Sequence, residues 1–151
     1  MNDAVERTYR KPPGWIGVDL DATIAYYDSW RGAEHIGEPI PDMLFRVKKW
    51  IAEGREVRIL TARAFPYLLV PVGVHVSDCA IMTGVEIPKE RVLESAGAVR
   101  AIRDWCKKHL GQHLTITCVK DYSMIELWDD RAVQVEPNTG VVLGRSTRGL
   151  S

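Results

Sequence analysis

Polar side chains able to do chemistry follow four apolar runs of this sequence, WIGV, VRIL, LTITCV and MIELW. If these runs are parallel strands, their carboxyl ends meet at one edge of a sheet, where the ligands of such sheets bind. Carboxylates crowd at such an edge only when a cation neutralises them. The polar side chains are, in chain order, Asp19, Asp21, Thr23, Thr61, Lys120, Asp129 and Asp130.

The residue types at this edge favour phosphoryl chemistry. Carboxylate oxygens with few histidines or cysteines beside them suit a hard cation, and Mg²⁺ is the expected one. A magnesium ion, a lysine and a hydroxyl around carboxylates form a receptor for a phosphoryl group. An aspartate carboxylate can also attack phosphorus itself.

The elements that must position these residues alternate between strands and helices. The stretch PDMLFRVKKWIAEG predicts a helix from about Pro41 to Gly54, and AGAVRAIRDWCKKHLG predicts another over 97–110. The order strand, helix, strand, helix, strand, strand indicates an α/β fold with a mainly parallel sheet flanked by helices. The helix residues expected to face the core are Met43, Leu44, Val47, Trp50, Ile51, Val99, Ile102, Trp105, Cys106 and Leu110.

The other segments are less regular. Residues 1–14 are expected to form an N-terminal arm, and residues 15–151 a single domain. Residues 24–41 hold aromatics and glycines and favour a hairpin or flap. Residues 65–87 are interrupted by prolines and glycines and have room for an extra strand or a short lid. The segment AVQVEP (132–137) is a candidate further strand.

The composition argues against several classes of protein. Lys plus Arg number 20 and Asp plus Glu number 20, and this zero net charge disfavours a protein that coats nucleic acid or anionic membrane. Three scattered cysteines do not suit a disulfide framework and favour a reducing compartment. A polar N-terminus and no apolar run of membrane-spanning length lead us to expect a cytoplasmic protein.

The four motifs together resemble those of the haloacid-dehalogenase-like (HAD) phosphohydrolase superfamily. DLDAT at 19–23, Thr61 after RIL, Lys120 after TCV and DD at 129–130 stand in the order of that family, and the resemblance runs over 16–131. The DDR motif is also similar to that of polynucleotide 3′-phosphatase domains, and ELWDDRAVQVEPNTG resembles small phosphatase-like proteins of bacteriophages. The resemblance implies a Rossmann-like HAD fold and a Mg²⁺-dependent phosphatase, a hydrolase of phosphomonoesters.

The resemblance also implies a catalytic role for four residues. Asp19 would attack phosphorus to form an aspartyl-phosphate. Asp21 would protonate the leaving oxygen and then activate water. Thr61 would hydrogen-bond a phosphoryl oxygen, although a hydroxyl at a strand end also suits capping of the next helix. Lys120 would offset the charge of the phosphoryl group and of Asp19.

The metal shell is implied in the same way. Asp19, the backbone carbonyl of Asp21, Asp129 and Asp130 would surround Mg²⁺, with Asp130 favoured as a direct ligand. Thr23 would brace the turn that holds Asp21.

The sequence departs from the family at one point and lacks a large cap. Ala22 stands where the family most often has glycine, and its Cβ is costly only if φ is positive there. Residues 24–41 are too few for a large cap domain, so we expect a minimal cap or none. An open site suits a nucleotide, or a phosphate at a nucleic-acid end, although a homo-oligomer could supply a lid from a second copy.

Two other classes of function remain as alternatives. A phospho-acceptor signalling domain of the receiver kind uses similar groups with Mg²⁺, but its acidic pair comes first in the chain, whereas DD comes last here. A non-catalytic HAD-like binding protein is the other alternative. Arg63 is a candidate substrate-binding residue and, like Arg131, equally suits a structural ion pair.

Two further patterns have competing interpretations. Tyr26, Tyr27 and Trp30 could stack on a base or sugar, but packing within the flap is the favoured interpretation. The string C-x₂-H-x₃-H-x₄-C over 106–118 has a spacing that zinc could use. Its first cysteine falls on the apolar helix face and its last inside a strand, which disfavours zinc.

Overall fold

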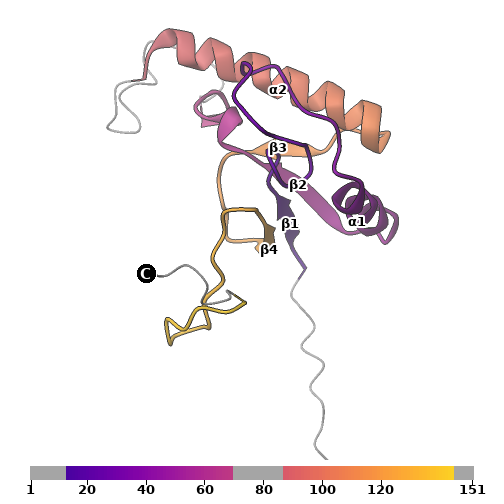
Figure 1. Cartoon of the computed structure of the whole chain (residues 1–151), viewed down its shortest axis with the longest axis vertical. Helices are drawn as coiled ribbons and strands as arrows, with labels where there is room; N and C mark the ends of the chain where they lie inside the picture. The colour runs from indigo at the N-terminus through magenta and orange to yellow at the C-terminus, as the bar shows by residue number, and fades with distance from the viewer. Residues whose placement is uncertain (1–12, 70–86, 145–151) are drawn as a thin grey trace, which may run out of the picture.

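The computed structural model describes residues 13–69 and 87–144 of the chain. Within these ranges strands and helices alternate, as Figure 1 shows. The N-terminal arm lies almost wholly outside the described residues, and so does most of the segment 65–87. The elements are β1 (Trp15–Val18), α1 (Pro41–Ala52), β2 (Glu56–Leu60), the 3₁₀ turns η1 (Ala62–Ala64) and η2 (Tyr67–Leu69), α2 (Lys89–Leu110), β3 (Thr115–Thr117) and β4 (Met124–Trp128).

The described strands form one parallel sheet in the order β3-β2-β1-β4. This confirms the predicted α/β class with a parallel sheet. The steps from β1 to β2 and from β2 to β3 run the same way across the sheet, so right-handed connections place α1 and α2 on the same face. In Figure 1, α2 runs along the top of the sheet and α1 lies beside it. All four strands therefore end at one edge.

The core lies between the sheet and these two helices. Alternate residues of β1 and β2 point into it, namely Ile16, Val18, Val57 and Ile59. Nine of the ten helix residues predicted to face inward belong to this core or pack against it. The tenth, Val99, is also buried but lies outside the main cluster. The hydrophobic pattern was therefore a sound guide to which faces are buried.

Two boundaries and one expected strand differ from the sequence prediction. Helix α2 begins at Lys89, about two turns earlier than expected, with Pro88 at its N-cap position. A proline fits there because the first N–H groups of a helix have no partner within it. β3 ends at Thr117, so Cys118 follows the strand rather than lying inside it. Residues 132–137 form no strand; the segment makes a single antiparallel bridge, Val135 to Val142.

The expected flap is a loop anchored at both of its ends. The Tyr26 N–H donates to the Glu38 carbonyl (2.8 Å), and the Ile40 N–H donates to the Ile24 carbonyl (2.8 Å).

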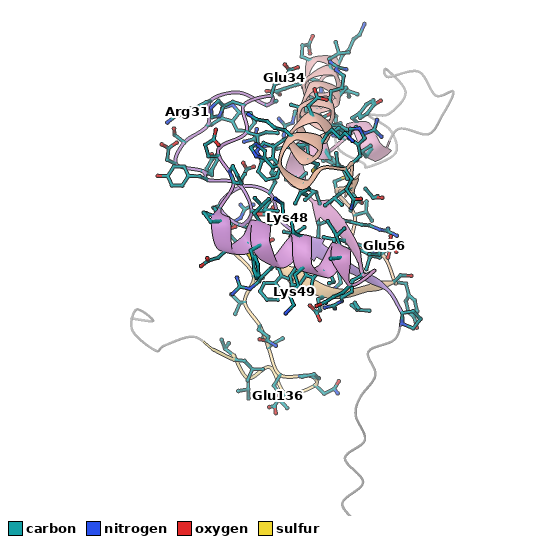
Figure 2. The ribbon with its side chains drawn as sticks, turned by 90° about the vertical axis from the view of Figure 1, so that its right-hand side faces the viewer. Arg31, Glu34, Lys48, Lys49, Glu56 and Glu136 are labelled. Carbon is teal, nitrogen blue, oxygen red and sulfur yellow. The ribbon has the colours of Figure 1, made fainter. Side chains whose placement is uncertain are left out.

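The same loop also contacts α2. The Trp105 indole on α2 donates to the Gly37 carbonyl (2.9 Å). Glu34 lies beside α2 (Figure 2), where its carboxylate packs against Gly97. We call residues 26–38 the aromatic loop.

None of the described helices combines the length and the apolar composition that crossing a membrane requires.

Two glycines test how firmly the aromatic loop is held. A Cβ on Gly37 would collide with the backbone carbonyl of Tyr26, which cannot move without opening the loop, whereas a Cβ on Gly97 would meet only the flexible end of Glu34. Gly37→Ala should therefore lower the free energy of unfolding by about 1–3 kcal/mol. Gly97→Ala should cost little, because alanine gains about 1 kcal/mol over glycine inside a helix. Urea denaturation checks both, and equal losses would contradict this account.

Candidate functional site

A pocket of about 250 Å³ opens at the edge where the strands end. It has an acidic floor and a rim of arginines and aromatic rings. The turns that follow β1, β2 and β4, the aromatic loop and the first turn of α2 contribute to it, although they are far apart in the sequence. The lining residues are Asp19, Asp21, Ala22, Tyr27, Trp30, Thr61, Ala62, Arg63, Arg91, Asp130 and Arg131.

Three carboxylates converge at the ends of β1 and β4. The Asp19 N–H donates to the Trp128 carbonyl (2.9 Å), which fixes the two strand ends side by side. One oxygen each of Asp19, Asp129 and Asp130 lies within 4.8 Å of the others. Within the described ranges this is the one group of three or more potential metal ligands so placed. An all-oxygen donor set of this kind suits a hard cation.

The crowding is visible in the ionisation of Asp19. Its pKa is raised from 3.8 to about 7, chiefly because the carboxylate is buried and then because the charge of Asp129 lies close by. The Leu20 N–H, which lowers the pKa, only partly compensates. Without a cation, Asp19 therefore keeps its proton up to about pH 7, well above the pH at which an ordinary aspartate loses it.

Thr23 connects two of these carboxylates. Its hydroxyl accepts from the Asp130 N–H (3.1 Å) and lies 3.5 Å from Asp19 Oδ2 and 3.4 Å from Asp130 Oδ1. A single hydroxyl hydrogen can serve only one of these oxygens at a time. Thr23 therefore links Asp19 to Asp130. The resemblance had implied only that Thr23 braces the turn that holds Asp21.

The Asp21 side chain does not join the three carboxylates. Its Oδ2 accepts from Arg63 Nε (2.7 Å) and its Oδ1 from Arg63 Nη2 (2.8 Å). The backbone carbonyl of Asp21 accepts no hydrogen bond from the described residues. Asp21 could thus contribute its carbonyl to a cation while its side chain faces the guanidinium.

Arg63 is buried, and each of its three side-chain nitrogens makes at least one hydrogen bond. Besides Asp21, it donates through Nη1 to the carbonyls of Ala33 (2.9 Å), His35 (2.9 Å) and Gly32 (3.2 Å) of the aromatic loop. Of the two interpretations left open by the sequence, the structure shows the ion pair. Arg63 also lines the pocket, and one of its two Nη2 hydrogens has no acceptor among the described residues.

Thr61 lies in the pocket wall, whereas Lys120 lies outside the pocket. Thr61 is buried in the pocket wall, and its oxygen accepts from the Arg63 N–H (3.2 Å), which leaves the hydroxyl hydrogen free to donate. Lys120 is exposed on the loop after β3 and does not line the pocket. Asp129 does not line it either, whereas Asp130 does.

Two further cations line the pocket, of which the sequence offered Arg131 as a possible substrate contact and did not single out Arg91. Arg91 comes from the first turn of α2, a turn that the sequence prediction missed, and Arg131 follows the acidic pair. The Arg131 side chain has no partner among the described residues, whereas Arg91 pairs with Glu94 (3.1 Å). Only the position of Arg131 beside the DD motif was a signal in the sequence.

Ala22 has a φ of 63°. The alanine that stands in place of the glycine of the resemblance therefore adopts the backbone conformation in which a Cβ is costly. The left-handed region costs a non-glycine residue about 1–2 kcal/mol. The Ala22 N–H donates to the Ala25 carbonyl (2.8 Å), which closes the tight turn between the two aspartates and Ile24. The turn sends Asp19 and Asp21 to different partners.

Comparison with known proteins gives no match to this chain, whether with family models, with curated proteins or with solved structures. The fold class and the geometry of the pocket are therefore the basis for a functional assignment.

The raised pKa of Asp19 predicts an unusual dependence of stability on pH. Between pH 3.8 and about 7 the metal-free folded chain retains a proton that the unfolded chain has released, so the free energy of unfolding should fall as pH rises through this range. Asp19→Asn, which does not titrate, should lack this contribution. Urea denaturation in EDTA from pH 4.5 to 7.5 checks it, because the difference between the two proteins isolates Asp19. Parallel pH profiles would contradict the burial of this carboxylate.

Proposed function

We propose that the chain is a Mg²⁺-dependent phosphomonoesterase with a Rossmann-like HAD fold that works through an aspartyl-phosphate. One observation carries the proposal. Asp19, at the end of the central strand β1, shares a pocket with the Thr61 hydroxyl and lies within 4.8 Å of the carboxylates of Asp129 and Asp130. The expected cytoplasmic location and the nucleotide or nucleic-acid substrate remain predictions.

The donor set fits Mg²⁺. The candidate ligands are oxygens of Asp19, Asp129 and Asp130 and the backbone carbonyl of Asp21, and such oxygens suit this small, hard ion. A bound magnesium ion supplies positive charge, which offsets the carboxylates and the phosphoryl oxygens. With this charge present, Asp19 would be ionised and able to act as a nucleophile.

The first step makes an acyl-phosphate on the chain. A carboxylate oxygen of Asp19 forms a bond to phosphorus while the bond from phosphorus to the leaving oxygen breaks. Asp21, after it has left Arg63 and taken up a proton from solvent, gives that proton to the leaving oxygen, so the alcohol departs neutral. In the second step Asp21 takes a proton from water, the water oxygen bonds to phosphorus, and the bond to Asp19 breaks. Phosphate leaves, and both aspartates return to their initial states.

The Arg63 pair limits how Asp21 can take part. Both carboxylate oxygens of Asp21 already accept hydrogen bonds from the guanidinium. To carry a proton toward substrate, Asp21 must release at least one of them. Arg63 is thus a positioning residue in the proposed mechanism, since it holds Asp21.

Donors for the phosphoryl oxygens are also available outside Arg63. Thr61 has its hydroxyl hydrogen free, and Arg131 lines the pocket without a side-chain partner among the described residues. Lys120 would have to turn inward from its exposed position after β3 to fill the role that the resemblance implies.

A second candidate function is phosphate or metal binding without turnover. The observations that favour it are the occupied carboxylate of Asp21 and the place of Lys120 outside the pocket. A phospho-acceptor domain of the receiver kind would in turn form a long-lived phospho-aspartate. Turnover separates the phosphatase from both.

Asp19 and Asp21 should have separate roles, as nucleophile and as acid and base. A panel of phosphomonoesters assayed with Mg²⁺ tests this. The panel includes nucleotides, 3′-phosphorylated oligonucleotides and p-nitrophenyl phosphate. Asp19→Asn should lower kcat by at least about a thousandfold and leave no phospho-enzyme, because the nucleophile is gone. Asp21→Asn should still form the intermediate from p-nitrophenyl phosphate, whose leaving group barely needs a proton. Near-normal turnover by Asp19→Asn would exclude the covalent mechanism. No turnover of any ester by the wild type would favour binding alone.

The source of the positive charge opposite Asp19 can be decided by two matched variants. If Lys120 turns in, Lys120→Met should lower kcat/KM by about a hundredfold, as for other preorganised donors. If Arg131 supplies the charge instead, Arg131→Met should show that loss. Circular dichroism and urea denaturation control for folding. Wild-type kinetics in a folded Lys120→Met protein would show that the third motif was placed on the wrong residue.

A further inference from the structure

The aromatic loop presents two rings to the pocket. Tyr27 and Trp30 both line it, yet they stay 40% and 51% exposed. Packing within the loop, the interpretation favoured from the sequence, does not account for rings that keep so much surface open. An exposed indole at the rim of a polar pocket is a typical contact for a ligand that is itself planar.

The Trp30 ring is held in place by two contacts. The Arg63 guanidinium lies over the indole, 4.9 Å from the ring centroid, and the same guanidinium holds Asp21. An ion pair between Arg31 and Asp28 (2.9 Å) closes the turn that carries Trp30. The ring is therefore oriented before any ligand arrives, which lowers the entropic cost of stacking.

The size of the pocket indicates where a large leaving group must go. At about 250 Å³ it is smaller than the roughly 300–1,000 Å³ of pockets that enclose a drug-sized ligand. A phosphoryl group placed at Asp19 would occupy the floor, so the rest of a larger ester would leave over the rim. Tyr27 and Trp30 stand at that rim.

We propose that Tyr27 and Trp30 form a stacking subsite for a planar ring in the leaving group, and that the substrate is a phosphomonoester carrying a nucleobase. This proposal rests on the proposed phosphatase function and specifies its substrate. Stacking on an aromatic side chain is available to every base, so the subsite would select for a base without selecting its identity.

The nucleobase can belong to a free nucleotide or to the end of a strand. Arg91 and Arg131 also line the pocket, and a strand would bring further phosphates toward them. In that case an oligonucleotide should bind more tightly than a mononucleotide, and the advantage should shrink as salt is added. Equal affinity would assign the subsite to free nucleotides.

The test compares esters that differ in their leaving group. Adenosine 3′-monophosphate, adenosine 5′-monophosphate, a 3′-phosphorylated oligonucleotide and glycerol 2-phosphate are assayed with Mg²⁺ on the full chain. In the wild type, kcat/KM for at least one nucleobase ester should exceed that for glycerol 2-phosphate. Trp30→Ala should lower kcat/KM for that ester by about tenfold, mainly through KM, and should lower it less for glycerol 2-phosphate. Trp30→Phe should restore most of the loss, because it retains a ring.

A matched control comes from the same loop. Tyr26 is also exposed but does not line the pocket, so Tyr26→Ala should keep the preference for nucleobase esters. Equal use of all four esters by the wild type, or an equal loss on all four in Trp30→Ala, would overturn the subsite while the phosphatase function stands. If no ester is hydrolysed, titration calorimetry with the same ligands decides the point. Tighter binding of the nucleobase esters, lost in Trp30→Ala, would then support the subsite and refute turnover, whereas equal affinities would refute both.

Discussion

The pairing of Asp21 with the buried guanidinium of Arg63 is the interaction on which the site depends. The Arg63 side chain is only 5% exposed, and a charge so far from water is tolerated only when it is paired and its donors are used. Asp21 and three carbonyls of the aromatic loop meet that requirement. One side chain therefore joins the turn after β1, the start of η1 and the loop over the pocket, so that none of the three can shift alone.

The three carboxylates at the same edge have the opposite problem. Asp19, Asp129 and Asp130 lie close together, and none of them forms an ion pair with another described residue. Thr23 and the backbone N–H groups supply hydrogen bonds but no charge. The two aspartates of the first motif thus have different environments, since Asp21 is neutralised by the protein and Asp19 is left to be neutralised from outside. That asymmetry suits the role proposed for Asp19, a nucleophile that depends on a cation and lies beside a second carboxylate.

The fold makes this asymmetry possible through a short turn. The positive φ of Ala22 turns the chain sharply after β1, so Asp21 does not continue along the strand direction beside Asp19. The local strain is offset by the contacts that the turn permits, and strained backbone of this kind persists where the surroundings determine it. The same loop then reaches α2, where Trp105 and Gly97 receive it. Core packing and site geometry are linked through these contacts.

The sequence by itself determined the alternation of strands and helices, the apolar faces of α1 and α2, and the edge at which Asp19, Thr61 and Asp130 meet, because these follow from hydrophobic period and from the parallel order of strands. It did not determine the start of α2, which Pro88 only permits, or the failure of residues 132–137 to form a strand, because pairing depends on neighbours far along the chain. Tertiary structure alone decided that Arg63 binds Asp21, that Lys120 stays outside the pocket and that Tyr27 and Trp30 face it. Those outcomes depend on the directions of side chains from segments distant in sequence, which no local pattern encodes.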